Sequence, residues 1–140
     1  DKFIGDAIMA VFDDRQCTDS PAEHAVRAAL LMQQAMPTFN QGRPLGLKMR
    51  IGINTGPLVR GDLGSRFVRR DYTVIGDTVN RANRYETQCP PGGVMISGST
   101  REILGDLITV EERTGLALKG VDDLATGFVV TGIAPRKESE

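Results

Sequence analysis

The sequence predicts a single α+β domain in which an antiparallel-rich sheet is flanked by helices. Three observations support this fold class: strand-like segments pair as hairpins, capped helices lie between them, and the regular strand–helix–strand alternation of parallel sheets is absent. The 140 residues are 40% hydrophobic and 25% charged, as is typical of one folded domain. We expect residues 1–134 to form this domain and residues 135–140 to form a C-terminal tail.

Composition and charge argue against several classes of protein. The net charge of −1 provides no strongly basic surface for nucleic acid or an anionic membrane. No segment approaches the roughly 18 apolar residues of a membrane span. The two cysteines, Cys17 and Cys89, lack metal-site spacing and are too few for a disulfide framework, which favours a reducing compartment. We therefore expect a cytoplasmic domain that makes no direct membrane contact, and membrane attachment of a parent protein stays open.

A β-hairpin is predicted at the start of the chain. Residues 2–4 and 7–12 are apolar-rich runs, and the pair Gly5-Asp6 between them is typical of a tight turn. Asp6 is therefore expected at the hairpin tip. A carboxylate there could bind a hard cation such as Mg²⁺ or Mn²⁺, and the alternative is an ordinary turn aspartate.

A long helix is predicted next. Ser20 and Glu23 form a capping box around Pro21, which predicts a helix that runs to about Met36. Its apolar side chains recur at three- and four-residue steps, so they share one face. These positions are Ala22, Ala25, Val26, Ala29, Met32 and Met36.

The middle of the chain alternates loops with extended segments. Residues 40–46 contain two glycines and a proline and are predicted to form a loop. Apolar and polar residues then alternate over residues 47–53, which predicts a half-buried strand. A second extended segment is expected to end at Val59, and residues 61–70 are expected to form a loop.

A second helix with short flanking elements is predicted in the remainder. Residues 72–75 are expected to form a strand, and residues 76–78 supply turn and cap residues for the helix. The helix is expected to run to about Glu86, and Pro-Pro-Gly-Gly at residues 90–93 prevents it from continuing. The remaining predicted elements are a strand at residues 94–96, a short helix capped by Ser99 with Glu102, and strands at residues 116–118 and 128–131.

Asn80 and Arg84 stand out on the second predicted helix. Four residues separate them, so both side chains project from one helix face and can act on one ligand. Arginine presents a fixed fork of charged donors that suits phosphate, and asparagine can orient a sugar or phosphate oxygen. The alternative interpretation is a solvated helix face.

Four motifs of the sequence, in order, resemble the class III adenylate and guanylate cyclases. They are DKFIGDAIMAVF at residues 1–12, MRIGINTG at residues 49–56, YTVIGDTVN with Ala82 and Arg84 from Tyr72 onward, and LKG at residues 118–120. The resemblance covers most of the chain. It implies the ferredoxin-like cyclase core, here without its first strand and helix.

By this resemblance Asn80 and Arg84 are the catalytic pair. Asparagine at the first position holds the ribose, and arginine at the second contacts the α-phosphate. Arg50 matches an arginine that contacts the terminal phosphates, and Lys119 matches a late phosphate-binding lysine. Each could also be an ordinary surface charge. Together they supply local positive charge that the net charge does not.

Lys2 and Thr73 match the two positions that read the base in this family. Lysine can donate to adenine N1 and a threonine hydroxyl can accept from the exocyclic amine, whereas guanine presents the reverse polarity. The pair therefore predicts adenine. Without the resemblance, Lys2 would be interpreted as an edge-strand charge and Thr73 as a β-former.

Asp6 matches the second of the two metal-binding aspartates of the family. The first lies on a strand upstream of the residues present here, so we expect the 140-residue segment by itself to be inactive. The intact domain is expected to bind ATP with two Mg²⁺ or Mn²⁺ ions and to form cyclic AMP and pyrophosphate in a homodimer. Two alternatives stay open: a cyclase for guanine or pyrimidine nucleotides, and a degenerate regulatory domain.

Overall fold

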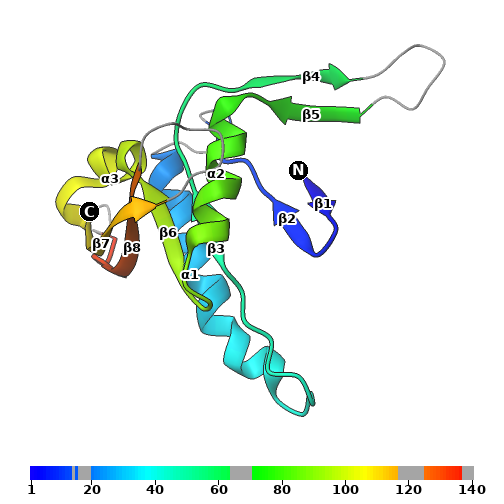
Figure 1. Cartoon of the computed structure of the whole chain (residues 1–140), viewed down its shortest axis with the longest axis vertical. Coiled ribbons are helices and arrows are strands. Elements are labelled where there is room, and N and C mark those ends of the chain that lie inside the picture. Colours follow the sequence, from blue (N-terminus) through cyan, green and yellow to red (C-terminus); the bar gives the residue numbers. More distant parts are fainter. Residues whose placement is uncertain (14, 16–19, 64–70, 117–124, 137–140) are drawn as a thin grey trace.

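The computed structural model of the chain describes residues 1–13, 15, 20–63, 71–116 and 125–136 (Figure 1). Its elements are, in order, β1 (Lys2–Ile4), β2 (Ala7–Met9), α1 (Pro21–Asn40), β3 (Ile51–Ile53), β4 (Val59–Leu63), β5 (Asp71–Ile75), α2 (Asp77–Gln88), β6 (Val94–Ser97), α3 (Gly98–Leu104), the 3₁₀ turn η1 (Gly105–Leu107), β7 (Ile108–Leu116) and β8 (Ala125–Ile133). In this described part of the chain, the strands form one four-stranded sheet and two separate hairpins.

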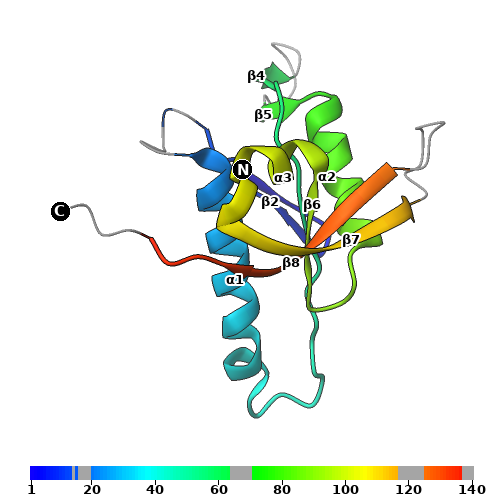
Figure 2. The same ribbon diagram turned by 90° about the vertical axis from the view of Figure 1, so that its left-hand side faces the viewer.

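The four-stranded sheet is the centre of the fold and has the strand order β3-β6-β8-β7. β3 and β6 are parallel, whereas the β6–β8 and β7–β8 pairs are antiparallel. α1 covers one face of this sheet and α2 covers the other (Figure 2). This arrangement confirms the expected α+β fold with helices flanking an antiparallel-rich sheet.

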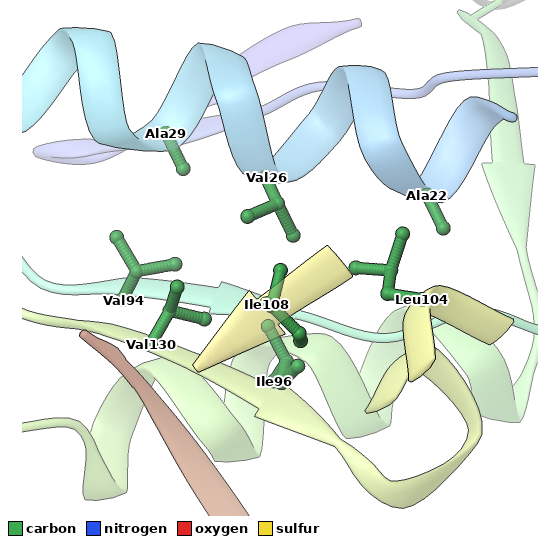
Figure 3. Packing of buried hydrophobic residues seen from close by; sticks show 8 residues of the cluster. All are labelled: Ala22, Val26, Ala29, Val94, Ile96, Leu104, Ile108 and Val130. Atoms are coloured by element: carbon green, nitrogen blue, oxygen red, sulfur yellow. The ribbon is translucent and has the colours of Figure 1, made fainter. Parts of the chain in front are cut away.

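The larger hydrophobic cluster lies between α1 and the sheet (Figure 3). Val26 of α1 is fully buried and points towards the sheet, where Val94 and Ile96 of β6 are also buried. The complete cluster is Ala22, Val26, Ala29, Val94, Ile96, Leu104, Ile108 and Val130. Burial of each larger aliphatic side chain contributes about 1.5–3 kcal/mol, so this cluster fixes α1 on the sheet.

The smaller cluster fixes α2 on the opposite face. Tyr85 of α2 and Cys89, which directly follows the helix, pack with Met95 of β6. Because side chains alternate along a strand, Val94 and Ile96 face α1 while Met95 faces α2. β6 is thus buried on both faces, which explains its uninterrupted apolar run.

α1 begins where the capping box predicts and ends later than expected. The Ser20 hydroxyl accepts a hydrogen bond from the Glu23 backbone nitrogen at 3.3 Å. The helix then continues through Pro37 to Asn40, instead of ending near Met36. A proline removes only its own N–H and distorts the preceding turn, so the following residues can still be helical.

The strand expected over residues 47–53 is confined to residues 51–53. The Asn40 amide explains the difference, because it donates to the Leu47 carbonyl at 2.8 Å and accepts from the Leu47 nitrogen at 3.0 Å. Leu47 therefore uses its backbone groups to close the turn after α1. Apolar alternation alone does not reveal this competing side-chain partner.

Boundaries in the last third also differ from the predictions. The cap of α3 is Ser97 and not Ser99, since the Ser97 hydroxyl accepts from the Thr100 nitrogen at 3.3 Å. β7 spans Ile108–Leu116, although a strand was expected only at residues 116–118, of which 117 and 118 lie outside the described residues. β7 is an edge strand of this sheet and most of its residues are exposed, so apolar alternation is weak there.

Both hairpins are antiparallel. The β1–β2 pair has the predicted two-residue turn, with Ile4 opposite Ala7 and with Gly5 at φ 60°, although β2 ends at Met9. β4 pairs with β5 and includes Gly61, which had been expected in a loop. None of the helices in the described part of the chain has the length and apolarity needed to cross a bilayer.

Candidate functional site

Asn80 and Arg84 lie one turn apart on α2, as the sequence predicts. Asn80 is exposed and Arg84 is half-buried, while Tyr85 of the same helix and Cys89 directly after it are buried against the sheet. Within the described part of the chain, no hydrogen bond or ion pair engages the side chain of Asn80 or Arg84. Within that part of the chain, neither group is engaged by another side chain or backbone group.

The middle of α2 is in backbone contact with β3. A Cβ atom added to Gly52 would overlap the backbone nitrogen of Glu86 and the carbonyl oxygen of Ala82. Only glycine allows this close approach, because every other residue would push the helix outward. Gly52 therefore fixes the distance between α2 and the sheet.

The first turn of α2 is tied to the segment that follows β3. The Asn54 amide donates to the Thr78 carbonyl at 2.9 Å, and the Thr78 hydroxyl donates to the Pro57 carbonyl at 2.5 Å. Ser99 of α3 in turn donates to the Thr55 carbonyl at 2.8 Å. These bonds matter because α2 has no side-chain cap at Gly76.

An open cleft of about 520 Å³ lies at this end of α2. It is lined by residues 54–59 and 76–78 together with Arg81 and Ser99. Arg81 is paired with Asp77 at 2.5 Å, so the charge that it brings to the cleft is balanced. Neither Asn80 nor Arg84 lines this cleft, which therefore adjoins the predicted catalytic pair without containing it.

Arg50 lies at the other end of α2. Its guanidinium forms an ion pair with Glu86 at 3.1 Å and donates to the Thr87 carbonyl at 3.2 Å. A cation at the last turn of a helix interacts favourably with the helix dipole. The predicted phosphate-binding role would require Arg50 to share or exchange these partners, and it stays a prediction.

Lys2 and Asp6 lie on the β1–β2 hairpin, away from α2. Lys2 pairs with Met9 across the hairpin, and Asp6 is exposed in the turn. Figure 1 shows this hairpin as a unit separate from α2. Among the described residues, no hydrogen bond or ion pair joins either side chain to Asn80 or Arg84. A single chain thus presents two separate groups of predicted site residues.

The other two predicted substrate contacts are only partly described. The backbone of Thr73 lies in β5 opposite Gly61, two residues before the strand ends. β5 leads into α2 through Gly76, so Thr73 is linked to the catalytic pair by a short connection. Lys119 lies outside the described residues, and its phosphate-binding role stays a prediction.

Burial changes the acid–base behaviour of the inner face of α2. Desolvation raises the pKa of the Tyr85 hydroxyl, and Arg81 opposes this shift. Desolvation also raises the pKa of the Cys89 thiol. Both groups stay neutral near pH 7, which suits the apolar contact with the sheet.

Asn54 received no separate role from the sequence. Asn54 is part of the motif at residues 49–56, but the motif assigned no function to it. The available signal was an asparagine directly after the half-buried strand β3, because asparagine side chains readily form hydrogen bonds to backbone groups. The structure shows such binding to α2.

Comparisons with known proteins identify the family. The family described as "Adenylate and Guanylate cyclase catalytic domain" matches residues 2–132. An adenylate cyclase of Anabaena cylindrica is 47% identical over 61% of this chain and 18% of its own length. Soluble guanylate cyclase 89Da of Drosophila melanogaster is 32% identical over 92% of this chain and 19% of its own length. The chain thus spans less than a fifth of either relative.

Solved structures agree with this assignment. The guanylyl cyclase Cya2 superposes with a TM-score of 0.85 at 36% identity, over 96% of this chain and 70% of that one. The adenylyl cyclase CyaB from P. aeruginosa superposes with a TM-score of 0.85 at 31% identity, over 100% of this chain and 74% of that one. Since the family match covers nearly the whole sequence, the chain belongs to the class III adenylate and guanylate cyclase catalytic domains.

Proposed function

We propose that this chain is the larger part of an adenylate cyclase catalytic domain that converts ATP to 3′,5′-cyclic AMP and pyrophosphate. The observation that carries the proposal is the pair on α2. Asn80 and Arg84 are one turn apart, accessible and unpaired within the described residues, on a helix that glycine contact fixes against the sheet. Membership of the cyclase family supplies the reaction class.

The two side chains suit the two substrate parts nearest the reaction. The Asn80 amide would orient the ribose. The ribose 3′-oxygen would then attack the α-phosphorus as the bond between the α-phosphorus and the leaving pyrophosphate breaks. The Arg84 guanidinium would donate to the α-phosphate oxygens, where negative charge develops. Arg50 and Lys119 would bind the leaving pyrophosphate. Phosphoryl transfer depends mainly on such positioning and charge stabilisation.

Lys2 and Thr73 support adenine as the base. Family membership leaves the base open, because the similar proteins include both guanylyl and adenylyl cyclases. A lysine donor and a threonine acceptor fit the N1 and amino groups of adenine, whereas guanine would place its own donor at N1 against the lysine.

A divalent ion is part of the proposal. Asp6 offers an exposed carboxylate in a turn, and carboxylate oxygen is the ligand that Mg²⁺ and Mn²⁺ prefer. Asp6 would hold two such ions together with the other metal-binding aspartate of the family, substrate phosphates and water. Such an ion, when bound, neutralises phosphate charge and favours ionisation of the attacking hydroxyl.

A homodimer would bring the metal-binding Asp6 of one protomer to the base-reading and catalytic residues of its partner. The hairpin with Lys2 and Asp6 is separate from α2 within one chain. If the Asp6 of one protomer faced Asn80 and Arg84 of its partner, two equivalent sites would form around a two-fold axis. A similar guanylyl cyclase domain is described as a non-canonical dimer, which supports dimerisation of such domains without supporting this particular arrangement.

Product analysis tests the proposal. The full-length enzyme that contains this chain should convert ATP to cyclic AMP with Mg²⁺ or Mn²⁺ and should use GTP much less efficiently. Preferential formation of cyclic GMP would identify the guanylate alternative. Nucleotide binding without formation of any cyclic product would identify a degenerate regulatory domain.

A further inference from the structure

α2 is held at two points by one short segment of the chain. Gly52 of β3 allows backbone contact with the middle of the helix, at Ala82 and Glu86. Asn54, two residues later, holds the first turn through its 2.9 Å bond to the Thr78 carbonyl. This segment therefore holds α2 through the backbone contact at Gly52 and the side-chain amide of Asn54.

We propose that Asn54 is a positioning residue for Asn80, an inference that rests on the proposed cyclase function. Asn80 lies between the two points of attachment, two residues after Thr78 and two residues before Ala82. Arg84 lies between Ala82 and Glu86, which both contact Gly52. Loss of the Asn54 bond thus loosens the turn that carries Asn80, which then depends on the bond from Thr78 to Pro57, and leaves the turn that carries Arg84 in place.

The bonds around Asn54 make the attachment directional. The Asn54 oxygen accepts a hydrogen bond from the Ser99 hydroxyl at 3.3 Å, which orients the amide so that its nitrogen faces Thr78. In a second bond, α2 supplies the donor: the Thr78 hydroxyl donates to the Pro57 carbonyl. A Cβ atom at Gly56 would come within 2.8 Å of that hydroxyl, so little space remains for the turn to shift while both bonds persist.

Asn54→Asp tests this inference with a small change of shape. The carboxylate keeps the acceptor for Ser99 but cannot donate to Thr78, and its oxygen repels the Thr78 carbonyl. In the full-length enzyme we expect a loss in kcat of about tenfold, because displacement of a positioned group by about 1 Å can cost up to about 100-fold. The KM for ATP should change less than kcat.

Double variants separate positioning from general damage. In an Asn80→Ala background, Asn54→Asp should lower kcat less than about twofold, because the group that it positions is already absent. In an Arg84→Ala background, it should keep its full effect, about tenfold. Equal losses in all backgrounds would overturn the inference, and so would a kcat that Asn54→Asp leaves unchanged.

A matched control is available on α1. Asn40, the last residue of α1, also donates its amide to a backbone carbonyl, that of Leu47 at 2.8 Å. Asn40→Asp removes the same kind of bond and should leave kcat unchanged. If Asn54→Asp does not fold, Asn54→Ala removes the same bond to the Thr78 carbonyl without adding a charge, and the same double-variant criterion applies.

Hydrogen exchange tests the attachment independently of turnover. The Asn80 amide donates to the Gly76 carbonyl at 3.3 Å in the first turn of α2. Asn54→Asp should accelerate its exchange relative to the Tyr85 amide further along the helix. Equal exchange in wild type and variant overturns the positioning role. Absence of cyclase turnover in the wild type would count against the proposed function, while exchange would still decide the role of Asn54.

Discussion

Two arginines on α2 differ in how their charge is used. Arg81 forms an ion pair with Asp77 in the first turn of the helix, whereas the half-buried Arg84 has no such partner among the described residues. An arginine that is partly removed from water and left without a carboxylate is disfavoured unless a ligand supplies the anion. This difference supports Arg84, and not Arg81, as the phosphate contact.

Arg84→Lys should therefore be much more harmful than Arg81→Lys. Lysine keeps the charge but loses the planar fork that can donate two bonds to phosphate oxygens. We expect Arg84→Lys to lower kcat by about 100-fold, a loss of about 2.7 kcal/mol in transition-state stabilisation. Arg81→Lys, which can still pair with Asp77, is the control and should change kcat less than about twofold. Similar losses for both variants would count against a direct role of Arg84.

The raised pKa values of Tyr85 and Cys89 predict a loss of stability at high pH. Each group ionises more readily in the unfolded chain than in the folded one, so the unfolded state binds fewer protons once the pH exceeds the ordinary pKa of 9.0 for Cys89 or 10.0 for Tyr85. Stability is full below these values and falls as the pH rises through the folded pKa values. Chemical denaturation from pH 7 to pH 11 measures the slope.

Variants assign that slope to its source. Cys89→Ala removes the thiol and should flatten the part of the curve that begins near pH 9. Tyr85→Phe removes the hydroxyl, together with its bond to the Thr126 carbonyl, and should flatten the part above pH 10. A slope that both variants retain would show that these groups do not cause it.

At the scale of elements, contact between β3 and α2 depends on the missing side chain of Gly52. Gly52→Ala should push α2 from the sheet and destabilise the fold by about 1–3 kcal/mol or more, as overpacking typically does. Gly98 at the start of α3 is the control, because a Cβ atom there meets open space. Gly98→Ala should be neutral or stabilising by about 0.5 kcal/mol. Denaturant unfolding measures both, and equal effects would argue against the contact at Gly52.

Helices and strands could be predicted from the sequence where neighbouring residues determine them. The β1–β2 turn and the start of α1 were predicted, since a Gly-Asp pair and a capping box act on adjacent residues. The length of β3 was predicted wrongly because Asn40, outside that segment, binds Leu47. β7 was largely missed because an exposed edge strand has little apolar alternation.

The same distinction applies to the candidate site. The spacing of Asn80 and Arg84 on one helix face could be predicted because it depends only on helical periodicity. The bond between Asn54 and Thr78 joins residues 24 positions apart, and the contact at Gly52 joins two packed backbones. Such contacts arise only when α2 lies on β3, so the sequence near Gly52 and Asn54 does not identify their partners on α2.

At the scale of the whole molecule, the separation of the hairpin from α2 predicts complementation between inactive variants. In a full-length homodimer, Asp6→Ala should remove the metal ligand from both sites, and Arg84→Ala should remove the phosphate contact from both. Each variant alone should be inactive. A heterodimer of the two would place both defects in one shared site and leave the other site intact.

Mixing therefore gives a quantitative result. If subunits exchange freely and the sites act independently, half of the dimers in an equal mixture are heterodimers with one intact site of two, so about a quarter of wild-type activity should return. Differently tagged chains, purified through both tags in turn, establish that heterodimers have formed. Each purified heterodimer should then show about half of wild-type activity, because one of its two sites is complete. A site built within one chain predicts a different result: every site in the heterodimer would carry one defect, and no mixing ratio would restore turnover.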